Sequence, residues 1–192
     1  MIEYLSSLIV DLLEKNKVIK NENVSIYQYG FEIFISSLIT VIIALLWGVI
    51  LNCIFEAALY FVLFVILRTV CGGYHAKTYW QCNFIFFITT LFVLLLYRFV
   101  PLKMFNELHI CSIIFSIITT IYYAPVENEN KPLSLEQKKF YRILSTAMVI
   151  MLVVISCVLK IKFNSAYSTL IDATLFIVAF SMFVTEPMKG GE

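Results

Sequence analysis

The chain alternates between long apolar runs and short polar segments. The apolar runs cover about residues 31–51, 54–71, 83–100, 108–123, 142–160 and 166–185. Most of these runs are close in length to the roughly 20 apolar residues that a helix needs to cross a bilayer. They are continuously apolar and lack the alternation typical of a membrane barrel. The pattern therefore predicts an all-α fold, a polytopic membrane helical bundle of about six transmembrane helices in a single domain over residues 1–192.

Residues 1–20 follow a different pattern, in which the apolar side chains fall on one stripe of a helix. These are Leu5, Leu8, Ile9, Leu12 and Leu13. The first basic residue, Lys15, follows the apolar residues, whereas a secretory signal would place its basic residues first. We expect an amphipathic helix that lies on the membrane surface or docks on the bundle.

Composition strengthens the membrane prediction. The chain is 61% hydrophobic and 14% charged, whereas soluble domains have roughly 45–50% apolar and about 25% charged residues. The net charge is only +1, which gives no argument for binding nucleic acid. The lipid bilayer is thus the expected surrounding of this chain, and nucleic acid is not an expected partner.

The distribution of Lys and Arg predicts the orientation, because cytoplasmic segments are enriched in these residues. With six spans and a cytoplasmic N-terminus, ten of the 14 cations fall inside and four fall outside. Both termini are then expected in the cytoplasm. Residues 124–141 would form a central cytoplasmic loop that contains Lys131.

One polar segment, Arg68–Cys82, separates the second and third apolar runs and would lie at the cytoplasmic face. It holds an imidazole, a thiol, two glycines and two cations. Polar groups at the edge of the hydrocarbon layer are costly and usually functional. His75 and Cys82 together suggest nucleophilic catalysis, in which an imidazole activates a thiol.

The spacing of this pair sets a structural condition. His75 and Cys82 are seven residues apart, which on an unbroken helix is about 10.5 Å of rise and too far for contact. The helix must therefore break, and Gly72-Gly73 supplies the conformational freedom to do so. We expect His75 in a turn and Cys82 near the start of the following helix, where the helix N-terminus favours a thiolate.

Two other interpretations of these residues are possible from the sequence. His75 and Cys82 can be unrelated interfacial residues. Cys71, His75 and Cys82 can be metal ligands, but their spacing matches no common zinc pattern and lacks a fourth ligand, so neither a metal nor another cofactor is predicted. The remaining cysteines lie in or beside apolar runs and are expected to be inert core residues: Cys53, Cys111 and Cys157.

The motif Arg68-x4-Gly73-x-His75-Ala76, followed by Cys82, resembles the signature of the accessory gene regulator B (AgrB) family. These are bacterial integral-membrane cysteine endopeptidases that process quorum-sensing propeptides. Tyr29-Gly30-Phe31-Glu32 and the loop with Ala124-Pro125 and Asn130-Lys131-Pro132 are also similar to the family. The resemblance implies an AgrD-like precursor peptide as substrate and a homodimer as the assembly.

The resemblance also implies a mechanism. His75 takes the thiol proton, Cys82 attacks a peptide carbonyl of the precursor, and His75 protonates the departing C-terminal tail. A cysteine of the retained peptide then closes a cyclic thiolactone. Other residues are expected to support the site. Arg68 would bind a substrate carboxylate or snorkel to the interface, Gly73 would shape the local backbone, and Lys77 would attract an acidic tail of the substrate. Gln81 and Glu32 would orient His75, and Lys131 belongs to the basic central loop.

A second class of function fits the same chain, a non-enzymatic membrane transporter or scaffold for a small peptide. Glu56 and Asp172 would then line its pathway. Asp172 interrupts the sixth apolar run and needs a polar partner, which the sequence does not name. His109 lies near the predicted outer face and is expected to be an ordinary interfacial residue.

Overall fold

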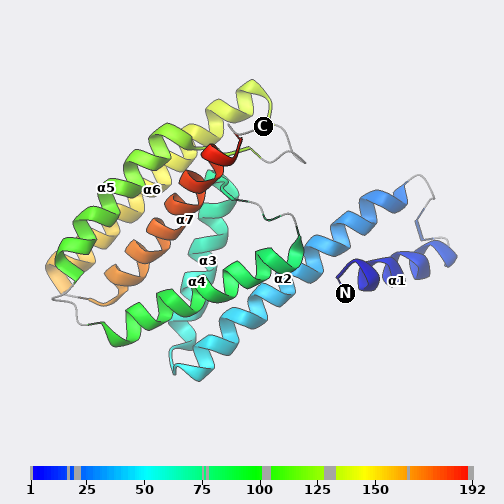
Figure 1. The fold of residues 1–192 in the computed structure, drawn as a ribbon, viewed down its shortest axis with the longest axis horizontal. Coiled ribbons are helices and arrows are strands. Elements are labelled where there is room, and N and C mark those ends of the chain that lie inside the picture. The colour runs from blue at the N-terminus through cyan, green and yellow to red at the C-terminus, as the bar shows by residue number, and fades with distance from the viewer. Residues whose placement is uncertain are drawn as a thin grey trace.

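The computed structural model describes residues 2–16, 18–19, 23–74, 76, 78–100, 105–127, 133–163 and 165–189, without the side chains of 105–107 and 186–189. This part of the chain is helical and contains no strand, so the all-α prediction is confirmed (Figure 1). The helices are α1 (Ile2–Lys15), α2 (Val24–Ile50), α3 (Ile54–Cys71), α4 (Tyr79–Phe99), α5 (Phe105–Tyr123), α6 (Leu135–Phe163) and α7 (Tyr167–Lys189).

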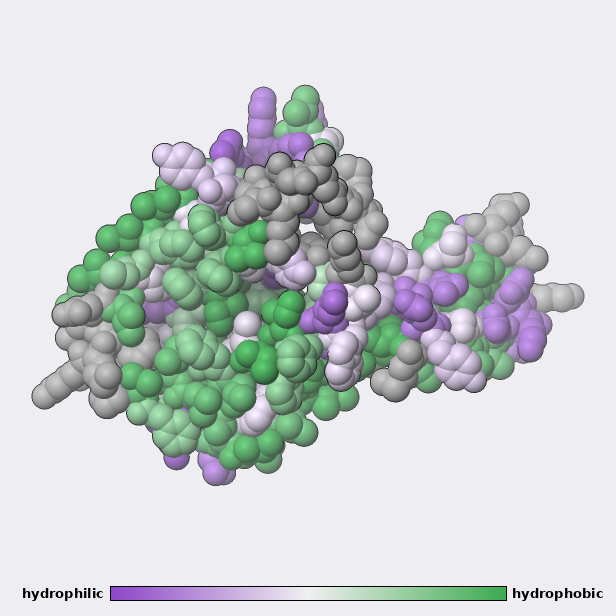
Figure 2. Space-filling model, viewed as in Figure 1, coloured by the Kyte–Doolittle hydropathy of each residue, from purple (hydrophilic) through white to green (hydrophobic). Residues whose placement is uncertain are grey.

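Five of these helices, α2, α3, α4, α6 and α7, are long and apolar enough to cross a membrane, and α5 adds a shorter apolar stretch, Leu108–Tyr123. The polytopic membrane bundle is therefore confirmed. Large apolar side chains point outward, as lipid-facing residues do, and Figure 2 shows hydrophobic residues over most of the bundle while hydrophilic ones gather over α1. α1 packs against α2 at one end of the molecule.

α7 is the central helix of the bundle. It packs against α3, α4, α5 and α6 (Figure 1). In its membrane-spanning stretch 61% of the residues are buried, against 17–28% in the other long helices. Small and polar side chains such as Ser168, Thr169 and Thr174 are buried along it. Small residues allow helices to approach closely in a bilayer, where packing rather than water exclusion drives association.

α6 begins at Leu135, inside the range expected to be the central loop. Ser134 caps it, because the Ser134 hydroxyl accepts from the Gln137 N–H at 3.2 Å and the Gln137 side chain accepts from the Ser134 N–H at 2.9 Å. This reciprocal pair is a capping box, which satisfies two N–H groups at a helix start. The first turns of α6 are polar and carry Glu136, Lys138 and Lys139.

Candidate functional site

The predicted break in the helix after the second apolar run is present. α3 ends at Cys71, and Gly72 and Gly73 follow with φ of 75° and 134°. Residues other than glycine rarely adopt these φ angles. A Cβ atom on Gly72 would lie 2.2 Å from the Val126 carbonyl oxygen, and one on Gly73 would lie 2.3 Å from Arg68 Nη1. The angles favour glycine at both positions, and at Gly72 the Val126 backbone also leaves no room for a side chain.

The segment after α3 is held by two other parts of the chain. The Val126 N–H, just after α5, donates to the Cys71 carbonyl at 2.9 Å, and the Tyr74 N–H donates to the Ser181 carbonyl of α7 at 3.1 Å. These backbone bonds fix the segment on both sides of the two glycines. The turn that leads from α3 to the predicted site is thus held by hydrogen bonds to distant parts of the chain.

Arg68 takes part in this anchoring. Its Nη1 donates to the Ser181 hydroxyl at 3.0 Å, and its carbonyl accepts from the Gly72 N–H at 3.0 Å. The contact described for this guanidinium is therefore internal and ties α3 to α7. The sequence suggested carboxylate binding or snorkelling for Arg68, and neither includes this contact. Arg68 also lies within electrostatic range of the Cys82 thiol.

Cys82 lies in the first turn of α4 and is exposed. Thr78 caps the helix: its side-chain oxygen accepts from the Gln81 N–H at 3.3 Å, and its carbonyl accepts from the Cys82 N–H at 3.1 Å. The partial positive charge of a helix N-terminus favours an anion in this turn. The Gln81 side chain is exposed. His75, Lys77 and Lys131 lie outside the described residues, so their predicted places relative to Cys82 remain predictions.

Glu32 links three helices beside this turn. Its carboxylate accepts from the Tyr79 hydroxyl of α4 at 3.1 Å and from the Ser6 hydroxyl of α1 at 3.4 Å. Glu32 itself belongs to α2. The predicted contact of Glu32 with His75 stays a prediction, and the contacts described for Glu32 hold the first residue of α4 and Ser6 of α1.

A cavity of about 680 Å³ opens between α1, α2 and α4 on the other face of this first turn. Its lining is mostly apolar and includes Ile2, Ile39, Ile43, Phe84 and Phe87, with Trp80 at the start of α4. Trp80 is 76% exposed. The first turn of α4 therefore presents an exposed thiol on one face and an apolar hollow on another.

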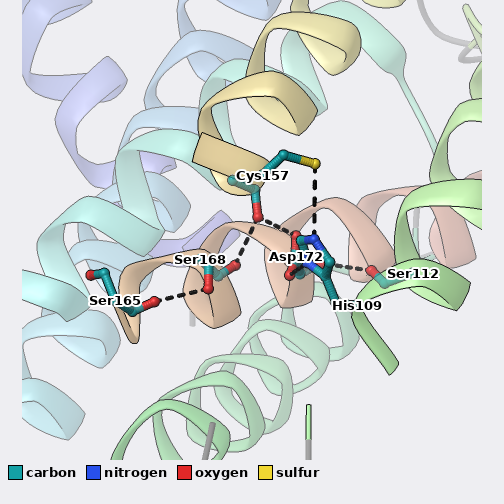
Figure 3. A network of polar contacts seen from close by, with 7 residues as sticks. His109, Ser112, Cys157, Ser165, Ser168 and Asp172 are labelled. Carbon is teal, nitrogen blue, oxygen red and sulfur yellow. Dashed lines mark hydrogen bonds and ion pairs between the residues drawn. The ribbon is translucent and has the colours of Figure 1, made fainter. Parts of the chain in front are cut away.

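A second polar cluster lies near the opposite end of the bundle (Figure 3). His109 of α5 is buried and its Nδ1 bonds to the Asp172 carboxylate of α7. The expectation that His109 is an ordinary interfacial residue was wrong, because the fold carries it inward to the acid that needed a partner. The Ser156 hydroxyl of α6 donates to the other Asp172 carboxylate oxygen at 2.6 Å, and Cys157 Sγ lies 3.9 Å from His109 Nε2.

The sequence signal that could have found this pair was the intramembrane acid itself. A buried carboxylate in a span demands a polar partner, but this signal does not identify His109, which lies near the start of α5 as Asp172 lies near the start of α7. In the described ranges, no group of three or more His, Cys, Asp or Glu side chains is arranged to hold a metal ion.

Comparisons with known proteins agree with the sequence motif. The family model for accessory gene regulator B (AgrB) matches residues 6–184. The chain is 31% identical over 144 residues to "Putative AgrB-like protein 2" of Clostridium perfringens (strain 13 / Type A), covering 72% of this chain and 67% of the relative. It is 32% identical over 149 residues to "Putative AgrB-like protein" of Clostridium beijerinckii, covering 76% and 72%. No solved structure matches the chain.

Proposed function

The chain belongs to the AgrB family, and from this premise we propose that it is a membrane cysteine endopeptidase and cyclase. Family membership supports a role in the agr quorum-sensing system, whose AgrB proteins process autoinducing peptides. The substrate we propose is a small AgrD-like precursor, and the product is a cyclic thiolactone. The described helices fit a multi-pass membrane protein, and we propose that both termini and the site face the cytoplasm.

In the proposed reaction His75 accepts the proton of the Cys82 thiol. The thiolate attacks a peptide carbonyl of the precursor, and His75 returns the proton to the amine of the departing C-terminal tail. The retained peptide is then a thioester on Cys82. A cysteine within it attacks the same carbonyl and releases the thiol of Cys82. This second step exchanges one thioester for another, and its attacking thiol is already held close.

The single observation that carries this proposal is the exposed Cys82 thiol in the first turn of α4, directly after an anchored glycine turn. α3 ends at Cys71 and α4 begins at Tyr79, so the two helices are separated ahead of Cys82. The partial positive charge of the α4 N-terminus favours an anion in this turn. Gly73 contributes by letting Arg68 and Ser181 approach the turn, because any side chain there would collide with both.

The test is proteolysis of a precursor peptide by the purified protein in lipid nanodiscs. Cys82→Ala is expected to lower cleavage by about 1,000-fold or more, as removal of a catalytic nucleophile does. The matched control is Cys111→Ala, which removes another exposed cysteine and should keep wild-type cleavage. His75→Gln should lose cleavage like Cys82→Ala.

A mass spectrum of the wild-type reaction should show the peptide thioester on Cys82 and a product lighter than the linear peptide by one water. Unchanged cleavage by a correctly inserted Cys82→Ala protein would overturn the proposal and favour a non-enzymatic peptide transporter or scaffold. Linear peptide as the only product would reject the cyclase part and retain the peptidase.

A further inference from the structure

We propose that Cys157, His109 and Asp172 form a second nucleophilic site, which accepts an acyl group from an apolar thioester presented by the bilayer. The three side chains come from three helices, α6, α5 and α7 (Figure 3). Cys157 Sγ lies 3.9 Å from His109 Nε2, and His109 Nδ1 bonds to Asp172. This is the order of groups found in nucleophile–imidazole–carboxylate triads. The inference does not depend on the proposed function at Cys82.

The hydrogen bonds of Asp172 set the orientation of the imidazole. Its Oδ1 accepts from the Ser156 hydroxyl at 2.6 Å, and its backbone carbonyl accepts from the Ser112 hydroxyl at 2.9 Å. In the proposed site His109 carries its proton on Nδ1 and donates it to Oδ2, which leaves the lone pair of Nε2 for the thiol. A carboxylate that holds the correct tautomer is what makes an imidazole a base for its neighbour.

The environment of Cys157 indicates the class of acyl donor. Its side chain is half-buried, while His109 and Asp172 are buried. The outward side chains of α6 beside it include the apolar, exposed Val154, Val158 and Ile161, while Lys160 lies one turn along within electrostatic range of Cys157 and Asp172. A reagent therefore reaches the sulfur from the lipid side of the helix, which selects for apolar acyl groups.

The chemical step balances without another reactant. The thiol proton of Cys157 passes to His109 Nε2, and Sγ attacks the thioester carbonyl. The new S–C bond forms as the bond to the leaving sulfur breaks, and His109 returns the proton to the released thiol. The exchange conserves the thioester bond, so it needs no outside energy source.

The test compares two thiols within one folded protein. Wild-type protein in nanodiscs is treated with the octanoyl thioester of N-acetylcysteamine, and the acylated cysteines are located by mass spectrometry. Cys157 is expected to react more than tenfold faster than Cys111, an exposed cysteine of α5 whose sulfur has no hydrogen bond among the described residues. The acetyl thioester should label Cys157 several-fold more slowly than the octanoyl one.

His109→Gln and Asp172→Asn should each slow the acylation of Cys157 by about 10- to 100-fold, the size of a general-base effect, and leave Cys111 unchanged. The Cys82→Ala protein should give the same result as wild type. Equal rates at Cys157 and Cys111, or undiminished acylation of Cys157 in a folded His109→Gln protein, would overturn the site. Equal rates with acetyl and octanoyl donors would overturn its preference for apolar acyl groups.

Discussion

The two ends of the bundle present a cysteine in contrasting ways. At one end Cys82 is exposed in the first turn of a helix, beside a turn that two glycines break open. At the other end Cys157 is half-buried within a continuous helix and faces a buried histidine–aspartate pair from two other helices. The first site is local in sequence, whereas the second exists only after three helices have packed. The residues proposed to act with Cys82 are close to it in the sequence, whereas the partners of Cys157 are brought to it only by the packing of the helices.

The largest expected effect is on stability at the Cys157 end. Asp172→Ala removes the hydrogen-bond partner of His109 and one hydrogen bond of Ser156. Each buried polar group left without a partner costs about 1–3 kcal/mol. We expect a lower thermal unfolding midpoint in detergent, followed by tryptophan fluorescence. Asp172→Asn keeps an acceptor and should lose less. An unchanged midpoint in Asp172→Ala would show that the cluster at this end does not hold the three helices together.

The next effect is at the glycine turn of the Cys82 end. Gly72→Ala forces a side chain into a positive φ, at a cost of about 1–3 kcal/mol, and places its Cβ against the Val126 carbonyl. We expect loss of precursor cleavage. The control is Gly30→Ala in α2, where an added Cβ meets no atom within 4 Å. Equal cleavage by both variants would show that the turn does not position the site.

A third prediction separates two roles of Arg68. Ser181→Ala removes the side-chain bond to Arg68 but leaves the Ser181 carbonyl that anchors Tyr74. A bond to a charged group contributes about 1.5–3 kcal/mol. If Arg68 only ties α3 to α7, then Arg68→Met and Ser181→Ala lower the unfolding midpoint and the cleavage rate alike. We expect this equality.

The discriminating measurement for Arg68 is KM for precursors with acidic and with neutralised tails. A KM that rises about tenfold in Arg68→Met, but not in Ser181→Ala, and only for the acidic tail, would reject the purely internal role. It would restore the sequence expectation that this guanidinium binds a substrate carboxylate.

The smallest effect is expected at Glu32. Tyr79→Phe removes one hydrogen bond to its carboxylate. The lower end of the range for a bond to a charged group, about 1.5 kcal/mol, is expected because Tyr79 and Glu32 are only half-buried. Glu32→Gln keeps an acceptor and should lose less, and the double variant should lose little more than Tyr79→Phe alone, because both changes act on the same contact. Fully additive losses, measured by thermal unfolding, would show that Glu32 stabilises the Cys82 end through another partner.

The contrast also explains how far the sequence could lead. Run lengths predicted the helices because hydropathy acts over about 20 residues at a time, and Gly72-Gly73 predicted a break because glycine relaxes a local constraint. Local signals cannot predict that His109 meets Asp172, because helix rotation and packing order decide this contact. The start of α6 at Leu135 was readable from Ser134 and Gln137, but the charges of its first turns made it look like a loop. The internal bond of Arg68 to Ser181 joins residues 113 positions apart, and no spacing rule anticipates it.

The position of α7 has a consequence for transport. In the described part of the chain α7 runs between α3, α4, α5 and α6 and is the most buried of the long helices. It therefore occupies the axis along which a pore through a helical bundle would run. A peptide that crossed the membrane with the help of this protein would have to travel along its lipid-facing perimeter or displace α7. Such a displacement would break the Ser181 contacts at one end of α7 and the Asp172 contacts at the other. Movement of α7 for export would therefore disturb both cysteine sites.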